Sequence, residues 1–399
     1  MKKKLFIIAG EKSGDLLGSK ILNKINKDQF DLFGIGGELM EKEGLKSLFP
    51  MEELSVMGIF EIVPKIFSIL KRIEETAQKI IELQPDVVLT IDSPDFCFRV
   101  MKKVKEADKD NKIKKIHLIA PSVWIYRKNR AKKIAKLYDL LFCILPFEPP
   151  YFTKYGLETI FVGHPIFDRD NQNINNNSNS NNSNDSNNII YQNIKKPNTI
   201  AITVGSRKSE VRRLLPIVLK TIEKIKNKEQ YEYHFLTTEH THNLVVEMMK
   251  KYNILNTNIK IKIIADRKEK NRTLANSMLA IAKSGTNTLE LATFSIPMVV
   301  IYKFNFLTNI IAKILKKQST VKYVSIINIL NNQETIPECL LDKCNPTNIA
   351  NKVNLLLDSP QLRLQQIQQN IKATEQLGYN SNNQSSAKIV KKIEEMLNV

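Results

Sequence analysis

Arginine is scarce in this chain of 399 residues, although the chain is strongly basic. Only 11 of the 60 basic residues are Arg, and the formal net charge is +19. Direct reading of base edges relies mainly on Arg, and the sequence has no motif typical of DNA- or RNA-binding domains. The charge therefore favours phosphorylated ligands or a membrane surface as partners. A basic nucleic-acid-binding module remains the alternative.

Cysteine is also rare, and the spacing of the four cysteines matches no zinc site or redox motif. No Asp-x-Asp pair that could hold a divalent cation follows a predicted strand. We therefore expect no metal ion, no cofactor and a reducing cytoplasmic compartment. The cysteines are Cys97, Cys143, Cys339 and Cys344.

Long apolar runs are missing too. None reaches the roughly 20 residues that a transmembrane helix needs. The basic start followed by Leu5–Ala9 resembles the beginning of a signal peptide, but the run is short and Glu11, Lys12 and Asp15 follow at once. We interpret this segment as the first strand of the fold.

The segment Val204–Val211 (VGSRKSEV) joins a predicted buried strand at residues 199–203 to a predicted helix. Gly205 lets the backbone approach a ligand closely, and the start of the helix offers unpaired N–H groups to an anion. Arg207 adds a planar cation suited to phosphate oxygens. The pattern predicts a diphosphate-binding loop, with an ordinary turn and a surface Arg as the alternative.

Three further glycine-rich turns follow predicted strands, at residues 10–15, 33–38 and 283–290. Hydroxyls and backbone N–H groups of the last turn could cradle a phosphate, and Glu290 could accept hydrogen bonds from a ribose diol. In the first turn Ser13 and Asp15 could instead cap the helix that follows, which would make it a plain strand-to-helix connection.

The strand predicted at residues 86–90 runs into Ile91–Phe96 (IDSPDF). A carboxylate just past the carboxyl end of a parallel strand lies where open α/β sheets bind ligands, so Asp92 is a candidate catalytic base. The alternative is that Asp92 or Asp95 caps the next helix.

Other polar or aromatic residues follow later strands. Trp124, the only tryptophan, lies beside Tyr126 and Arg127 and could form an apolar wall with a cation. His164 could act as a base or a ligand contact, although a His next to a Pro is more often structural. Residues 239–242 hold Glu and His side chains that could bind a metal, but no further ligand is evident and we interpret them as a loop.

The chain length and a polar tract indicate two domains. Residues 170–188 are almost entirely Asn, Ser and Asp, and this composition cannot form a core, so we expect a disordered insert or linker. Strands alternate with helices on both sides of it. We predict an α/β fold of two Rossmann-like domains that face a cleft, residues 1–168 and 196–399, joined by residues 169–195. The second domain would end in helices.

An apolar cluster with nearby cations lies at residues 57–72. Such a segment is typical of proteins that rest on a membrane surface, although it could also be the buried face of a helix. Lys65, Lys71 and Arg72 supply the cations. The apolar members are Met57, Ile59, Phe60, Ile62, Val63, Ile66 and Phe67.

An ordered set of short motifs along nearly the whole chain resembles lipid-A-disaccharide synthase. Each motif is weak, but the ordered set is very specific. Two departures are the Asn-rich insert and Thr203-Val204, where the family usually has Leu-Pro. The motifs are AGEKSGD (9–15), VMGI (56–59), IDSPDF (91–96), PSVW (121–124), LPFE (145–148), VGHP (162–165), GSR (205–207), SGT (284–286) with Glu290, and YVS (323–325) with Asn328.

The resemblance implies a GT-B fold and one reaction. An inverting hexosyltransferase would join UDP-2,3-diacylglucosamine to 2,3-diacylglucosamine 1-phosphate, giving a β-1,6-linked disaccharide 1-phosphate and UDP in lipid A biosynthesis. The enzyme would be cytoplasmic and peripherally associated with the bacterial inner membrane. It would bind no nucleic acid, and its oligomeric state stays open. A different two-domain glycosyltransferase or a sugar-nucleotide epimerase is the alternative.

The resemblance also suggests roles for individual residues. Asp92 would be the base, and Arg207 would stabilise the leaving UDP. The donor would contact Gly205, Ser206, Arg207, Ser284, Gly285, Thr286, Glu290 and Asn328. The acceptor side of the cleft would hold Gly10, Ser13, Gly14, Asp15, Trp124 and His164.

Overall fold

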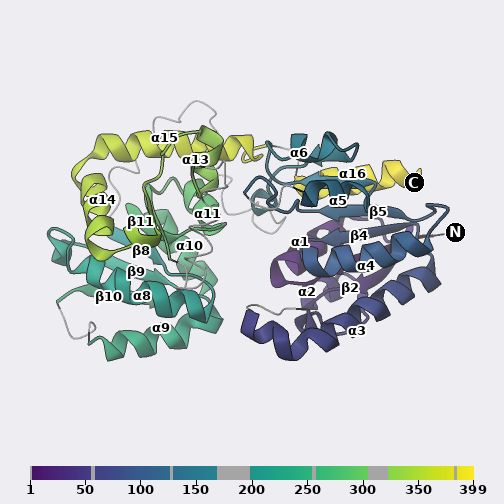
Figure 1. Ribbon diagram of the computed structural model, residues 1–399. Helices are drawn as coiled ribbons and strands as arrows, with labels where there is room; N and C mark the ends of the chain where they lie inside the picture. The colour runs from purple at the N-terminus through teal and green to yellow at the C-terminus, as the bar shows by residue number, and fades with distance from the viewer. Residues whose placement is uncertain are drawn as a thin grey trace. The chain divides into compact units, whose positions relative to one another are not determined.

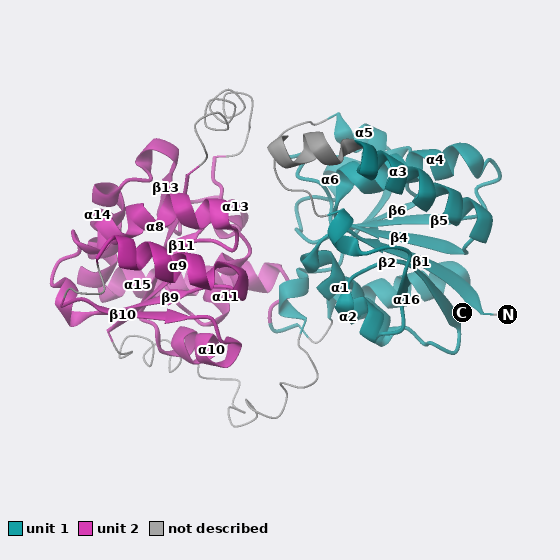
Figure 2. Cartoon of the chain, turned by 90° about the horizontal axis from the view of Figure 1, so that it is seen from below, with its two compact units in different colours: residues 1–171, 380–399 teal, residues 172–379 magenta. Residues whose placement is uncertain are grey.

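The computed structural model describes residues 2–54, 59–125, 129–168, 198–253, 258–303, 322–381 and 384–399, with only the backbone for residues 59–66. The chain divides into two compact units, residues 1–171 with 380–399 and residues 172–379 (Figure 2). The division after residue 171 falls within the expected linker. The Asn-rich tract itself lies outside the described residues.

Unit 1 contains a parallel sheet whose strand order is β3-β2-β1-β4-β5-β6-β7 (Figure 1). All pairings are parallel, so the central strands are covered on both faces and their sequences are continuously apolar. The strands are β1 (Lys3–Ala9), β2 (Phe30–Ile35), β3 (Lys46–Ser47), β4 (Val87–Ile91), β5 (Lys114–Leu118), β6 (Leu140–Cys143) and β7 (Glu158–Phe161).

Helices cover both faces of this sheet. Leu5 and Ile7 of β1 pack in one apolar cluster with α1 and α16, while Phe6 and Ile8 pack in a second cluster with α3, α4 and α5. This alternation follows from the two-residue period of a strand. The helices are α1 (Lys12–Lys24), α2 (Glu38–Lys42), α3 (Ile59–Leu83), α4 (Pro94–Ala107), α5 (Arg130–Ala135), α6 (Pro150–Thr153) and α16 (Ser385–Leu397).

Unit 2 repeats the arrangement with six parallel strands in the order β10-β9-β8-β11-β12-β13. Ile200 and Ile202 of β8 pack against buried residues of α8, α9 and α14, and α10 and α11 contact β8 and β11 outside that cluster. The strands are β8 (Thr199–Thr203), β9 (Glu232–Leu236), β10 (Lys260–Ile264), β11 (Leu279–Lys283), β12 (Met298–Tyr302) and β13 (Glu338–Leu340). The helices are α8 (Lys208–Ile222), α9 (Glu239–Lys251), α10 (Arg267–Asn276), α11 (Asn287–Thr293), α13 (Ile326–Asn331), α14 (Pro346–Asp358) and α15 (Pro360–Gln376).

The last helix differs from the sequence-based expectation, which placed all of residues 196–399 in the second domain. Helix α16 belongs to unit 1, where Ile389 and Ile393 join the apolar cluster beneath β1 (Figure 2). The carboxylate of Asp168 accepts hydrogen bonds from the N–H groups of Ser385 and Ser386, at 2.7 and 2.9 Å. A buried acceptor at the start of α16 thus attaches the C-terminus to unit 1.

Two local predictions also need correction. Residues 239–242 were expected in a loop, but they form the first turn of α9, with Thr238 at its N-cap. The short strands β3 and β13 were not predicted, because two or three residues between polar segments show no clear period.

Candidate active site

Unit 2 has a topological switch point between β8 and β11. The chain leaves these neighbouring strands toward opposite edges of the sheet, and ligands of open α/β sheets bind beyond the strand ends at such a place. The Gly205 turn follows β8 and the Gly285 turn follows β11. A hydrogen bond of 2.7 Å from Asn287 Nδ2 to Thr203 Oγ1 joins them. The structure therefore brings together the two turns that were predicted to bind the donor.

Glycine is required at position 205 for two reasons. Its φ of +110° is unfavourable for other residues, and a Cβ atom there would lie 2.4 Å from Glu210 Oε2. Gly285 has a φ of +153°. Both glycines allow sharp turns directly after a strand, so that the backbone of each turn lies at the strand ends.

Glu210 changes the expected electrostatics of the Gly205 turn. Its side chain is 8% exposed, and Oε2 accepts hydrogen bonds from the N–H groups of Ser206 and Arg207 at 3.2 and 3.4 Å. These two amides, which were expected to be open to a ligand anion, already have an acceptor. Among the described residues, no group accepts from the N–H groups of Lys208 and Ser209, so these remain available.

Two cations accompany this carboxylate. Lys283 Nζ lies 3.0 Å from Glu210 Oε1, and Arg207 Nη1 lies 4.0 Å from the same oxygen. The Arg207 side chain is 56% exposed, whereas that of Lys283 is 20% exposed. Arg207 is therefore well placed to reach an anion, while Lys283 is held against the protein.

The second turn presents further polar groups. Ser284 donates its N–H to the carbonyl of Ile301 at 3.0 Å, and Thr286 is exposed at the N-cap of α11. Glu290 is exposed at the other end of the first helical turn. Partial desolvation raises the pKa of its carboxyl, and the charges of Lys270 and Arg267 oppose that rise. Glu290 is thus an accessible acceptor near positive charge.

Asn328 is not accessible in the same way. Its side chain is fully buried, Nδ2 donates to Ile336 O and Glu338 Oε1 at 2.8 and 2.9 Å, and Oδ1 accepts from the Ile336 N–H at 2.8 Å. Every strong donor of the carboxamide is used within the protein. The geometry does not support the predicted direct donor contact and indicates that Asn328 positions the segment before β13.

Unit 1 has its own switch point, between β1 and β4. Gly10 follows β1 and Asp92 follows β4. A Cβ atom on Gly10 would lie 2.5 Å from Ser93 Oγ, so glycine allows the two turns to meet. The predicted residues Gly10 and Asp92 are therefore neighbours at the position where this sheet would bind a ligand.

Asp92 sits in an unusual backbone conformation. Asp92 and Ser93 have φ values of +50° and +44°, and the Asp92 N–H donates to Leu118 O at 2.9 Å. Burial raises the pKa of the Asp92 carboxyl, against a hydrogen bond from the Ser93 backbone that lowers it. A carboxylate with a raised pKa is a better proton acceptor. Asp95 instead pairs with Arg130 at the start of α5.

The other residues of the first turn that were predicted to contact the acceptor differ in exposure: Ser13 is on the surface of α1, whereas Gly14 and Asp15 are buried. A Cβ atom on Gly14 would lie 3.3 Å from Ala9 Cβ. Asp15 is 5% exposed and accepts hydrogen bonds from the N–H groups of Gly37, Leu39 and Met40, between 2.9 and 3.2 Å. Asp15 thus caps α2, so the geometry does not support a contact of its carboxylate with a ligand.

Trp124 and His164 are also buried. Trp124 donates from Nε1 to Glu148 Oε1 at 3.3 Å and meets Phe147 edge to face. His164 Nδ1 accepts from the Ile166 N–H at 3.3 Å, and burial lowers the pKa of its imidazole to about 4. Burial thus favours the neutral imidazole, and Nδ1 already has a partner within the protein, whereas the ligand contact of His164 stays a prediction.

Glu148 is a buried carboxylic acid for which the sequence predicted no role. Its carboxyl is 2% exposed, and burial raises its pKa to about 7, although hydrogen bonds from Leu145 and Trp124 oppose the rise. The motif Leu145–Glu148 contained this residue. Only the tertiary structure shows that its carboxyl group is buried and accepts hydrogen bonds from Leu145 and Trp124.

The predicted membrane segment is only partly described. Met57 lies outside the described residues, and Phe67 is 81% exposed on α3. Among the described helices, none combines the length and apolar character that a membrane span requires. For Ile59, Phe60, Ile62, Val63 and Ile66 only the helical backbone is described.

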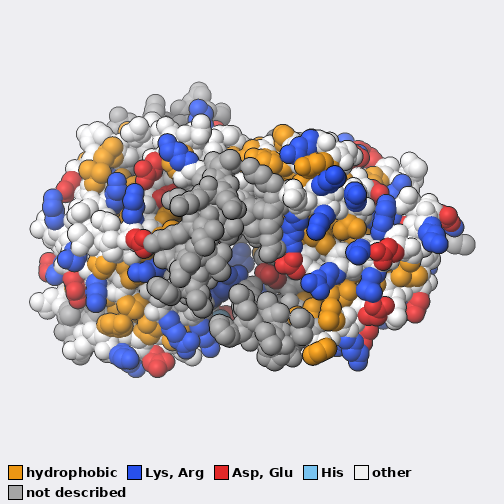
Figure 3. All heavy atoms as spheres, in the orientation of Figure 1, with side chains coloured by type: hydrophobic (Ala, Val, Ile, Leu, Met, Phe, Trp, Pro, Cys, Tyr) orange, Lys and Arg blue, Asp and Glu red, His pale blue; other side chains and the backbone are white. Residues whose placement is uncertain are grey.

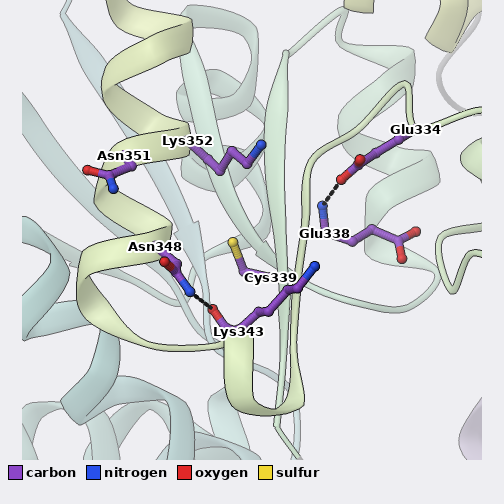
Figure 4. Close-up of a pocket in the computed structure, with 7 residues that line it drawn as sticks. All are labelled: Glu334, Glu338, Cys339, Lys343, Asn348, Asn351 and Lys352. Atoms are coloured by element: carbon purple, nitrogen blue, oxygen red, sulfur yellow. Dashed lines mark hydrogen bonds between the residues drawn. The ribbon is translucent and has the colours of Figure 1, made fainter.

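The described residues contain no group of three or more His, Cys, Asp and Glu side chains placed to hold a metal ion. A polar pocket of about 320 Å³ lies in unit 2 between β13 and α14 (Figure 4). Its lining includes Cys339, Lys343 and Lys352 but none of the residues at the switch point. This pocket is therefore not part of the predicted donor site.

Comparison with known proteins decides the family. The sequence matches the family model of lipid-A-disaccharide synthetase over residues 5–393. The chain belongs to this family. This confirms the resemblance based on the motifs, and identifies the chain as a bacterial glycosyltransferase of lipid A disaccharide biosynthesis.

Relatives in this family match nearly from end to end. The lipid-A-disaccharide synthase of Rickettsia bellii (strain OSU 85-389) is 40% identical over 384 residues, which cover 95% of each chain. That of Rickettsia prowazekii is 38% identical and covers 98% of this chain and 99% of the relative.

Solved structures confirm the GT-B fold. Acinetobacter baumannii MurG has a TM-score of 0.58 at 13% identity, covering 99% of this chain and 100% of that one. The UDP-GlcNAc 2-epimerase of Neisseria meningitidis, bound to UDP-GlcNAc, also has a TM-score of 0.58 at 13% identity, covering 100% and 99%.

Proposed function

We propose that this family member joins UDP-2,3-diacylglucosamine to 2,3-diacylglucosamine 1-phosphate. The products would be the β-1,6-linked disaccharide 1-phosphate and UDP. The observation that carries this proposal is the family match, which runs through both switch points. The carboxylate of Asp92 lies at one of them and the exposed guanidinium of Arg207 lies at the other, and acceptor activation and diphosphate departure require such groups.

Asp92 would be the general base. Its carboxylate would take the proton of the acceptor 6-hydroxyl while the hydroxyl oxygen forms a bond to the anomeric carbon of the donor. The bond from that carbon to the diphosphate oxygen would break, and its electron pair would leave with UDP. Attack from the face opposite the leaving group inverts the configuration. The raised pKa of the Asp92 carboxyl suits this role.

Arg207 would stabilise the departing UDP. Its guanidinium is exposed and planar, and the unpaired N–H groups at the start of α8 lie beside it. Ser284, Gly285 and Thr286 would contribute backbone and hydroxyl groups from the second turn. No step of this scheme needs a metal ion, because Arg207 and the helix ends supply the positive field.

Glu290 would accept hydrogen bonds from the ribose hydroxyls of the donor. It is an exposed carboxylate one helical turn from Gly285, and a diol offers two donors that match its two oxygens. The UDP-GlcNAc bound to the Neisseria meningitidis epimerase gives a precedent for a UDP-sugar on this fold.

The acyl chains of both substrates imply work at a membrane surface. We expect residues 57–67 to enter the headgroup region of the cytoplasmic face of the inner membrane as a peripheral segment. The strongly exposed aromatic ring of Phe67 supports this, because a large apolar side chain in water gains from contact with lipid. Net positive charge would add attraction to anionic lipid.

Mass spectrometry after incubation with both diacyl sugars tests the proposal. We expect a disaccharide 1-phosphate together with UDP, and UDP release that depends on the lipid acceptor. An epimerase, which the fold also permits, would instead convert the donor sugar without any disaccharide. Absence of a disaccharide under conditions in which the protein binds UDP would contradict the proposed transfer.

A specific nucleic-acid binder is the less favoured candidate. On the face that Figure 3 shows, Lys and Arg side chains of the described residues lie interspersed with Asp and Glu. A nucleic-acid surface would instead gather cations along one stripe. Weak retention on DNA or RNA at moderate salt is the expected result.

A further inference from the structure

Lys283 is less exposed than Arg207, the other cation beside the donor turns, and it has no role in the proposed mechanism. It is the last residue of β11, at the switch point of unit 2. Its Nζ lies 3.0 Å from Glu210 Oε1 and 5.5 Å from the centre of the Tyr302 ring. A Cβ atom on Gly285 would lie 3.4 Å from Nζ. The ammonium group therefore lies next to both donor turns.

Glu210 creates an electrostatic problem at this place. Its carboxylate caps the amides of Ser206 and Arg207, within the same turn that is proposed to hold a diphosphate. A negative charge that is 8% exposed is weakly screened by solvent, so it would repel a nearby anion strongly. The cap stabilises the turn but opposes the ligand.

We infer that Lys283 is a positioning residue of the donor site, which neutralises Glu210 so that the turn can bind a nucleoside diphosphate. This inference rests on the proposed function. Lys283 would act through Glu210 and would not itself contact the diphosphate. It would also keep Arg207 free, because a Glu210 carboxylate without Lys283 would attract the Arg207 guanidinium, now 4.0 Å away.

The relative exposure of the two cations supports this division of roles. The Lys283 ammonium pairs with the Glu210 carboxylate at 3.0 Å, lies 5.5 Å from the centre of the Tyr302 ring and is 20% exposed, so it is held in place before a ligand arrives. Arg207 is 56% exposed and makes the longer ion pair. The fixed cation balances the buried charge, and the exposed cation remains for the ligand.

Titration calorimetry with UDP on the full chain tests the inference. Lys283→Met keeps the aliphatic stem and removes the charge, and we expect it to weaken UDP binding about 10-fold or more. Lys283→Arg should stay within about threefold of the wild type, because it restores the charge. Lys262→Met is the matched control: it removes a Lys that pairs with Glu232 at 3.7 Å on the edge strand β10, and should leave UDP affinity unchanged.

The double variant Lys283→Met with Glu210→Gln separates neutralisation from direct contact. If Lys283 acts through Glu210, removing the carboxylate as well should restore UDP affinity to within about threefold of Glu210→Gln alone. A double variant as weak as Lys283→Met would overturn the inference, because it would mean that the ammonium contacts the diphosphate. Wild-type affinity in Lys283→Met would overturn it too.

Steady-state kinetics give a second readout. Lys283→Met should raise the KM for the UDP-sugar and leave the KM for the acceptor unchanged. Melting temperatures identify any variant that has lost its fold. If Lys283→Met does not fold, Lys283→Arg and Glu210→Gln still test the inference, because each should bind UDP with an affinity no more than about threefold below that of the wild type. A wild-type protein that binds no UDP would contradict the proposed function itself.

Discussion

The two switch points share one topology and carry opposite chemistry. In unit 1 a turn with Gly10 follows β1 and a second turn follows β4. In unit 2 a turn with Gly205 follows β8 and a second turn follows β11. In unit 1 the second turn presents the carboxylate of Asp92, whereas unit 2 presents Arg207 and Lys283 around a capped helix start. The comparison teaches that the fold fixes where a ligand meets the sheet, while a few side chains fix what that ligand can be.

The backbones of the two places differ as well. In unit 2 the positive φ angles belong to Gly205 and Gly285, which adopt them without strain. In unit 1 they belong to Asp92 and Ser93, for which the same conformation is costly. A strained carboxylate at a strand end is consistent with a functional side chain that glycine could not replace.

Asp92→Asn should have the largest effect. Without a base, turnover should fall on the order of 100-fold or more, while UDP binding at the other switch point stays unchanged. The Asn side chain keeps the volume and tolerates a positive φ, so the fold should persist. Initial rates of disaccharide formation and UDP calorimetry measure both; near-normal turnover would remove Asp92 from the proposed mechanism.

Asp92→Gly sharpens the same comparison. Glycine suits a φ of +50°, so this variant should melt no lower than the wild type while remaining inactive. A clear loss of stability would show that the Asp92 side chain mainly supports the turn.

Arg207→Ala should affect the switch point of unit 2. We expect turnover to fall by about 100-fold, because the departing diphosphate loses its exposed cation. The melting temperature should change little, since the side chain is 56% exposed. Arg207→Lys serves as the control and should recover part of the rate; equal loss in both variants would point to the planar geometry rather than the charge.

Glu148 predicts a pH dependence of stability that comes from unit 1. Its pKa is raised from 4.5 to about 7, so the folded state holds more protons than the unfolded state between these values. Stability should therefore fall as pH rises through this window, with a slope from this group of up to about 1.4 kcal/mol per pH unit. Urea unfolding of the wild type and Glu148→Gln across pH 4.5 to 7 measures it; identical slopes in the two proteins would contradict the raised pKa of the Glu148 carboxyl.

Phe67→Ser should change membrane contact without changing either switch point. The ring is 81% exposed, so we expect a stability change within about 0.5 kcal/mol. Sedimentation with anionic vesicles should show weaker binding, and activity on lipid acceptors should fall severalfold. Unchanged vesicle binding would place the membrane contact elsewhere on the chain.

Deleting residues 171–187 should have the smallest effect. The segment is rich in Asn and Ser, which bury little apolar surface, and long insertions are tolerated in chain connections. Melting temperature and turnover should both stay close to those of the intact chain. Loss of soluble protein would show that the tract supports one of the units.

Several features of the fold and site could be predicted from the sequence because their causes are local. The continuous apolar runs of β1 and β8 predicted buried parallel strands, and both match the structure. Gly205 and Gly285 mark sharp turns through their own backbone freedom. The pairing of these turns then follows from parallel strands whose carboxyl ends share one edge of the sheet.

The tertiary structure alone decided which polar groups remain free. Asp15 accepts from Met40, and Asp168 accepts from Ser385, 217 residues away, so their carboxylates cap helices that no local pattern connects with them. The side-chain amide of Asn328 likewise donates both of its hydrogen bonds within the protein, to Ile336 and Glu338. A motif shows which side chains are present at a turn. Their availability depends on the donors that folding brings within about 3 Å, because a buried polar group must find a partner.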